Sequence, residues 1–158
     1  MIEILIGNIA SGKSTYCSRR AREGAVIISD DAIVSGLHSD QHELYDKKLK
    51  PLYKAVENQI VASALMLGKD VVVDRGLNLT IKSRRRFIGL GHSLDSEVIA
   101  VVFSFEPPQV HADRRQAHDL RNYSHEYWLD VATAFDNKYI PPISSEGFDE
   151  IITIDPYP

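Results

Sequence analysis

The feature that most constrains the fold of this 158-residue chain is a glycine-containing segment near its N-terminus. Residues 7–14 read Gly-Asn-Ile-Ala-Ser-Gly-Lys-Ser and match the phosphate-binding pattern GxxxxGK[ST] at every fixed position. The apolar run Ile2–Ile6 precedes this loop and predicts a buried strand, and a helix is expected from Ser11 to about Arg22. A strand, a glycine-rich loop and a helix in this order predict an α/β nucleotide-binding fold.

The loop predicts a binding site for the phosphates of a nucleotide. Its backbone N–H groups would surround phosphate oxygens at the positive end of the helix dipole. Lys13 would reach the β- and γ-phosphates as a catalytic cation, and the Ser14 hydroxyl would hold Mg²⁺. The predicted nucleotide-binding residues of the loop are Gly7, Asn8, Ile9, Ala10, Ser11, Gly12, Lys13, Ser14 and Thr15.

Apolar runs alternate with helical patterns along the rest of the chain. Further strands are expected over 25–29, 70–74, 97–105 and 150–154, and helices over 43–67, over 82–91 and around 127–135. Apolar strands separated by helices predict a parallel sheet with right-handed crossovers. Because no linker divides the pattern, we expect one domain over residues 1–158.

Composition excludes several classes of protein. The chain carries 18 Lys+Arg against 22 Asp+Glu, a net charge of −4, which disfavours a protein that coats duplex nucleic acid but allows local binding of a nucleic acid. No apolar run reaches the length of a membrane span. The single Cys17, expected in the core, permits neither an internal disulfide nor a cysteine-based zinc site. We therefore expect a cytoplasmic protein without membrane or zinc, and the sequence leaves its oligomeric state open.

Nucleotide binding alone leaves several activities open. A GTPase switch would carry a guanine-reading Asn-Lys-x-Asp, whereas residues 137–140 read Asn-Lys-Tyr-Ile. The chain also lacks the signature loop of transport ATPases and the length of a ring-forming ATPase. A small α/β chain with this loop favours a kinase that transfers phosphate to a hydroxyl.

Carboxylates at two strand ends suit that chemistry, which needs a group to orient the acceptor hydroxyl and a ligand for the metal. Asp30 and Asp31 follow the second expected strand, at the edge where open α/β sheets bind ligands. Because Asp is also a favoured helix N-cap, one of them can cap the next helix, and we assign Asp31 as the base. Asp74 ends the third strand, where it would hold Mg²⁺, contact the acceptor, or cap the following turn.

Arginines cluster in two further segments. Arg114, Arg115 and Arg121 lie in a polar stretch that predicts either a helical lid over about 110–126, closing over the phosphates, or a solvated basic helix. The three consecutive arginines at 84–86 cannot share one helix face, and we expect them in solvent, where they could contact a polyanion. Trp128 is expected in the packing between helices.

These motifs together resemble the polynucleotide-kinase-like P-loop kinases, a group that includes zeta-toxin-type kinases. The resemblance is carried by residues 7–15, by Ser29-Asp30-Asp31, by the segment 74–80 with the arginines after it, and by the tail 146–151. It implies a P-loop NTPase fold with a five-stranded parallel sheet in order 2-3-1-4-5 flanked by helices, and ATP with Mg²⁺ as donor, although GTP stays open. It also implies Asp31 as general base. From the candidate lid we assign Arg115 and Arg121 as catalytic cations and place Arg114 at the nucleotide. The acceptor-binding residues that it implies are Asp30, Asp31, Asp74 and Asn78.

Two departures concern the acceptor. The polynucleotide kinases carry an arginine three residues after the catalytic aspartate, where this chain has Val34. They also space two lid arginines four residues apart, whereas this chain has Arg114, Arg115 and then Arg121. The resemblance thus predicts an ATP-dependent kinase that phosphorylates a nucleic-acid hydroxyl, such as a polynucleotide 5′-hydroxyl. Three alternatives stay open: a kinase of 5-hydroxymethyluracil bases in phage DNA, which would act in the host cytoplasm; a small-molecule, nucleoside or zeta-toxin-like kinase; and a nucleotide-dependent switch.

Overall fold

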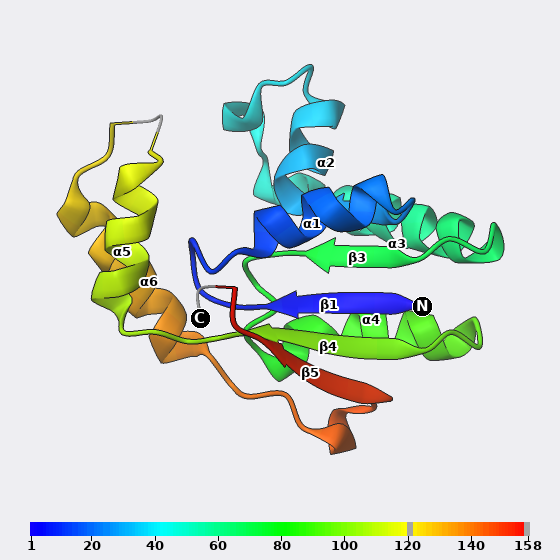
Figure 1. Ribbon diagram of the computed structural model, residues 1–158. Helices are drawn as coiled ribbons and strands as arrows, with labels where there is room; N and C mark the ends of the chain where they lie inside the picture. Colours follow the sequence, from blue (N-terminus) through cyan, green and yellow to red (C-terminus); the bar gives the residue numbers. More distant parts are fainter. Residues whose placement is uncertain (120–121, 157–158) are drawn as a thin grey trace.

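The computed structural model describes residues 1–119 and 122–156, and a five-stranded parallel sheet forms its centre (Figure 1). The spatial order of the strands is β2-β3-β1-β4-β5, which confirms the order expected above. The strands are β1 (Ile2–Ile6), β2 (Val26–Ser29), β3 (Val71–Asp74), β4 (Val98–Phe103) and β5 (Glu150–Ile154). All five run in the same direction, so the loops that follow β1, β2, β3 and β4 meet at one edge of the sheet.

Two apolar layers hold the sheet between helices. On one face, alternate residues of the strands pack against α3 and α4, with Val61 and Phe87 fully buried. On the other face, Leu5 and Val101 pack against Tyr16 of α1. Burial of both faces explains why the strands are continuous apolar runs. The helices are α1 (Lys13–Arg22), α2 (Asp30–Leu37), α3 (Lys50–Met66), α4 (Ile81–Ser93), α5 (Pro108–Ala117) and α6 (His125–Lys138).

The segment between β2 and β3 differs most from the sequence expectation. A helix, α2, begins directly at Asp30, and its range was not predicted, since it has only eight residues and contains Gly36. The helix expected from residue 43 begins only at Lys50, because Pro51 favours the first turn of a helix and is excluded from its interior. Two short 3-10 turns, His42–Leu44 and Lys47–Leu49, precede it.

Helices α5 and α6 pack against each other beyond the carboxyl ends of the strands, at the left of Figure 1. They include the described part of the predicted lid, and Trp128 is buried between them as expected. None of the helices in the described part of the chain is long and apolar enough to cross a membrane.

The basic segment of α4 corrects one expectation. We expected the arginines at 84–86 in solvent, and for Arg84 this is wrong, because its side chain is fully buried. The guanidinium donates to both carboxylate oxygens of Glu146, at 2.6 and 2.9 Å, and to the carbonyls of Asn78 and Ile140. A buried arginine requires a paired carboxylate, so this residue joins α4 to the segment before β5.

Candidate active site

The phosphate-binding loop lies between β1 and α1, at the carboxyl edge of the sheet (Figure 1). Gly12 has φ +92°, which a β-carbon would strain. A β-carbon on Gly7 would lie 2.7 Å from Ser11 Oγ, so the backbone can approach this closely only with glycine. Asn8 is fully buried, with its amide donating to the Ala132 carbonyl of α6 at 2.9 Å. The side chain of Asn8 therefore fastens the loop to α6 and is not available to a nucleotide.

The ammonium of Lys13 lies inside the curve of this loop. It donates to the carbonyls of Gly7 and Asn8 and to Ser11 Oγ, the contact to Gly7 being 3.0 Å and that to Ser11 3.1 Å. Burial lowers the pKa of Lys13 to about 8, and the nearby Asp74 carboxylate partly offsets that effect. The oxygens that Lys13 contacts are uncharged, and the Asp74 carboxylate only partly balances its positive charge. Such a cation can bind the negative phosphates of a nucleotide.

Asp74 at the end of β3 lies beside the first turns of α1. Its Oδ2 is 3.7 Å from the Cys17 Sγ, and the Lys13 ammonium is the cation that most affects it. Burial raises the pKa of Asp74, Lys13 lowers it, and the carboxylates of Asp30 and Asp31 raise it further. The Asp74 carboxylate and the exposed Ser14 hydroxyl are hard oxygen ligands of the kind that Mg²⁺ takes beside nucleotide phosphates, so the predicted metal ligands fit that ion. Burial and Asp74 together raise the pKa of Cys17 to about 12, which keeps it a thiol in the core.

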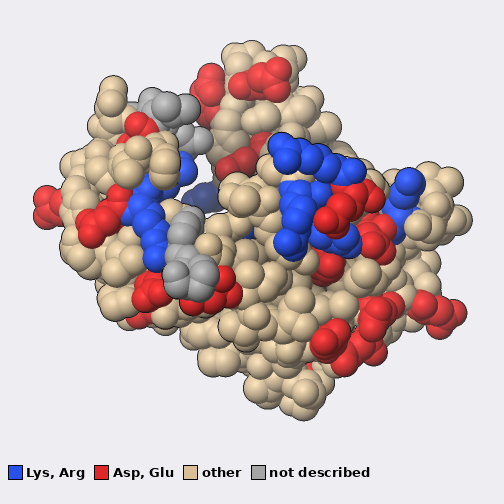
Figure 2. All heavy atoms as spheres, in the orientation of Figure 1, with Lys and Arg blue, Asp and Glu red and all other residues tan. Residues whose placement is uncertain are grey.

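A first cavity, of about 210 Å³, opens over the loop. Arg114 and Arg115 of α5 line it opposite the loop, so the structure brings both predicted arginines to the nucleotide side. The Arg115 guanidinium lies 4.7 Å from the centre of the Trp128 ring, which steadies it by a cation–π contact. Figure 2 shows this region as a hollow between α5 and the α1–α2 side of the molecule, with basic side chains on the α5 wall. The third predicted arginine, Arg121, lies outside the described residues.

A second, larger cavity, of about 470 Å³, lies on the α2 side. Asp30 and Asp31, which were predicted to bind an acceptor, both line it. Asp31 is exposed, with Oδ1 3.1 Å from Nε2 of His42, while Asp30 is half-buried and paired. The full lining is Asp30, Asp31, Val34, His42, Tyr45, Lys50, Tyr53, Lys54, Glu57, Arg75, Leu77, Lys82, Ser83 and Arg86.

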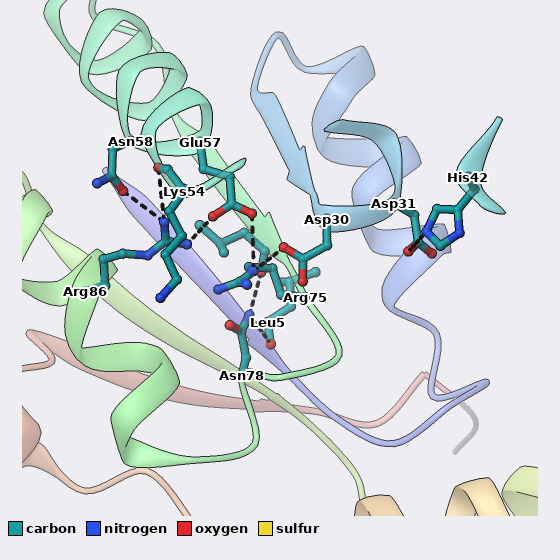
Figure 3. A network of polar contacts seen from close by, with 11 residues as sticks. Leu5, Asp30, Asp31, His42, Lys54, Glu57, Asn58, Arg75, Asn78 and Arg86 are labelled. Atoms are coloured by element: carbon teal, nitrogen blue, oxygen red, sulfur yellow. Dashed lines mark hydrogen bonds and ion pairs between the residues drawn. The ribbon is translucent and has the colours of Figure 1, made fainter. Parts of the chain in front are cut away.

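A network of charges forms the inner wall of this second cavity (Figure 3). The Arg75 guanidinium pairs with Asp30 and lies 3.4 Å from Glu57 Oε1, and Arg86 pairs with the other oxygen of Glu57. Arg86 is therefore a second exception to the solvent-exposed arginines expected at 84–86. Burial raises the pKa of Glu57, a hydrogen bond with Asp30 adds to that, and the two arginines oppose it. The network fixes the relative positions of α2, α3 and α4 around the cavity.

Arg75 and Glu57 were not predicted as site residues. Each position carried a local signal, but neither signal indicates that the two residues pair. Arg75 directly follows a carboxylate at a strand end. Glu57 occupies a position of α3 that the helical period places with the buried Tyr53, Val61 and Ala64, and a charged residue at such a position indicates a buried partner.

Asn78 was predicted to contact the acceptor, and the structure gives its side chain another role. It is 1% exposed and does not line the second cavity. Its amide donates to the carbonyls of Leu5 and Val73, both at 3.0 Å. These two hydrogen bonds join the end of β1 to the end of β3, so Asn78 holds together the two strands that carry the loop and Asp74 (Figure 3).

Comparison with known proteins places the sequence in a protein family. A family model described as an AAA domain matches residues 2–131. No curated protein matches the sequence.

Solved structures share the fold at low identity. A chain of the Pnkp1/Rnl/Hen1 RNA repair complex has a TM-score of 0.65 at 16% identity, covering 88% of this chain and 46% of that one. Chaetomium thermophilum Kti12 in complex with ADP-AlF3 has a TM-score of 0.63 at 16% identity, covering 99% and 90%. A gluconokinase from Sinorhizobium meliloti 1021 has a TM-score of 0.58 at 19% identity, covering 99% and 82%.

Proposed function

The chain belongs to this family of AAA domains, and from that premise we propose that it is an ATP-dependent kinase that phosphorylates a hydroxyl group of a nucleic acid. The observation that carries the proposal is the pair of cavities at the carboxyl edge of the sheet, one over the phosphate-binding loop and one lined by Asp30 and Asp31. Asp74 lies between the two, because it is paired in the sheet with Ser29, directly before Asp30, and its carboxylate is 3.7 Å from Cys17 of α1. A donor phosphate and an acceptor hydroxyl bound in these cavities would meet beside Asp74.

The residues of the two cavities can divide the reaction between them. Lys13, together with Arg114 and Arg115, would offset the charge on the γ-phosphate as it moves. Asp31 would accept the proton of the acceptor hydroxyl while the new oxygen–phosphorus bond forms and the bond to the ADP oxygen breaks. Mg²⁺, when held by Ser14 and Asp74, supplies further positive charge at the β- and γ-phosphates.

The nucleic-acid acceptor is supported by the resemblance of the motifs to polynucleotide kinases and by the similarity of the fold to a chain of an RNA repair complex. The kinase reaction is supported independently of the acceptor, because the gluconokinase has the same fold.

The deciding experiment is an acceptor panel with labelled ATP. It would contain 5′-hydroxyl DNA and RNA, DNA with hydroxymethyluracil, nucleosides and gluconate, and Lys13→Ala protein would serve as the control for contaminating kinases. We expect label on a nucleic acid and none with the variant. Transfer to gluconate or nucleosides alone would replace the nucleic-acid acceptor, and ATP binding without transfer to any acceptor would contradict the kinase reaction.

A further inference from the structure

We call the second cavity, which Asp30 and Asp31 line, the acceptor-side cavity. Its outer wall carries three lysines, Lys50 and Lys54 of α3 and Lys82 of α4, which we call the lysine wall. All three line the cavity and all three are exposed, which places them toward its mouth. In the described residues, none of their ammonium groups has a hydrogen bond or an ion pair. The lysine wall therefore presents positive charge to whatever enters.

The two arginines of the same cavity, unlike the lysines, are held in ion pairs. Arg75 is paired with Asp30, and Arg86 is paired with Glu57. The inner wall is thus nearly neutral, with its carboxylates and guanidiniums matched (Figure 3). Excess positive charge in this cavity belongs to the lysine wall.

Helix geometry places the lysine wall on two sides of the opening. Lys50 and Lys54 are four residues apart and share one face of α3 with Glu57, which also lines the cavity. Lys82 is four residues before Arg86 on the cavity-facing side of α4. Cations on two separate helices suit a ligand with more than one negative group.

The mouth also offers apolar surface. Tyr45 and Leu77 line the cavity and are 39% and 57% exposed. The Tyr45 ring stacks on the buried Tyr53 at 5.6 Å between ring centres, while part of the Tyr45 side chain stays exposed. A flat aromatic group such as a nucleobase can stack on such a ring.

We propose that the lysine wall binds backbone phosphates of a single-stranded nucleic acid next to the nucleotide that is phosphorylated, so that the substrate is an oligonucleotide and a free nucleoside is a poor acceptor. This inference rests on the proposed function. A volume of about 470 Å³ is in the range for one small ligand, so neighbouring nucleotides lie at the mouth, where the lysines are. The site assigned here to the acceptor phosphates lies on α3 and α4, whereas the α2 position Val34 cannot bind them.

The test compares acceptors of increasing charge: a nucleoside, its 3′-monophosphate and a short 5′-hydroxyl oligonucleotide. KM for each would be measured at two salt concentrations with wild-type protein and with Lys50→Ala, Lys54→Ala and Lys82→Ala. Lys48→Ala and Arg85→Ala are matched controls: Lys48 lies in the 3-10 turn directly before α3, Arg85 lies on α4, and both are exposed outside the cavity lining.

We expect KM to fall from nucleoside to monophosphate to oligonucleotide. Each lysine-wall variant should raise KM for the oligonucleotide several-fold and reduce its salt dependence by about one in log–log slope, with little change in kcat or in KM for ATP. The control variants should match wild type. A lower KM for the monophosphate than for the oligonucleotide would overturn the proposal that the substrate is a single-stranded nucleic acid. The acceptor would then be a small molecule that carries a phosphate.

Direct binding separates this inference from the kinase reaction. Anisotropy of a labelled oligonucleotide should show weaker binding for the lysine-wall variants. If binding depends on these lysines but no acceptor is phosphorylated, the proposed function fails and the lysine wall stands. If wild-type protein phosphorylates a nucleoside with the same KM as the oligonucleotide, or the control variants weaken binding as much, the lysine wall is wrong and the kinase reaction stands.

Discussion

The two cavities are built in different ways. The cavity over the loop is lined by six consecutive residues of the chain, 10–15, together with side chains of α5, and the side chain of Asn8 is directed into the protein. The acceptor-side cavity is made of side chains from α2, α3, α4, the β3–α4 connection and the segment before α3. A backbone site can keep its shape while most of its side chains change, whereas a side-chain site changes with each substitution. If the proposed function holds, we expect a few charged residues of this second kind of site to set the specificity for the acceptor.

The largest effect is expected from the two neighbouring aspartates of the acceptor side. Asp31→Asn should lower kcat by about 10²–10⁴-fold, because the group that takes the hydroxyl proton is removed, and should leave ATP binding unchanged. Asp30→Asn should act mainly on the acceptor KM, since Asp30 holds Arg75. Single-turnover transfer and nucleotide titration measure the two quantities. Full activity in Asp31→Asn together with loss in Asp30→Asn would move the base to Asp30.

The next effect concerns the donor side. Lys13→Ala should lower kcat by about 10²–10³-fold and weaken ATP binding, because one cation of the loop interacts with the moving phosphate. The acceptor oligonucleotide should still bind, which distinguishes the two cavities. Arg19→Ala, on the exposed side of α1, is the control and should leave both measurements at wild-type values. Loss of oligonucleotide binding in Lys13→Ala would show that the cavities are not independent.

A third comparison lies within the arginines of α4. Arg84→Ala leaves Glu146 buried without its partner and should lower the free energy of unfolding by about 3–5 kcal/mol. Arg85→Ala, at an exposed neighbouring position, should change it by less than about 0.5 kcal/mol. Urea unfolding of the two variants measures the difference. Equal stabilities would mean that the buried pair does not hold α4 to the segment before β5.

The same division explains what the sequence could predict. The loop is contiguous, so its pattern identified the predicted nucleotide side, and the buried central strands β1, β3 and β4 made the parallel sheet predictable from apolar runs. The inner wall of the acceptor side could not be predicted, because Arg75 and Glu57 are 18 positions apart and meet only through the packing of α3 against β3. Arg84 shows the same limit: its partner Glu146 is 62 residues away, and no local pattern separates it from Arg85.

The smallest effect is a pH dependence confined to the donor side. Because burial lowers the pKa of Lys13 to about 8, free protein loses this charge as the pH rises above that value. Bound phosphates favour the ammonium and raise its pKa, so the complex holds more protons than the free protein in this range. ATP affinity should therefore fall with rising pH above about 8, by at most about tenfold per pH unit, and binding should take up a proton.

Calorimetry in buffers of different ionisation enthalpy, at about pH 7 and about pH 9, would detect proton uptake at the higher pH alone. Uptake that is equal at both values, or that persists in Lys13→Ala, would show that another group titrates and that Lys13 stays charged throughout.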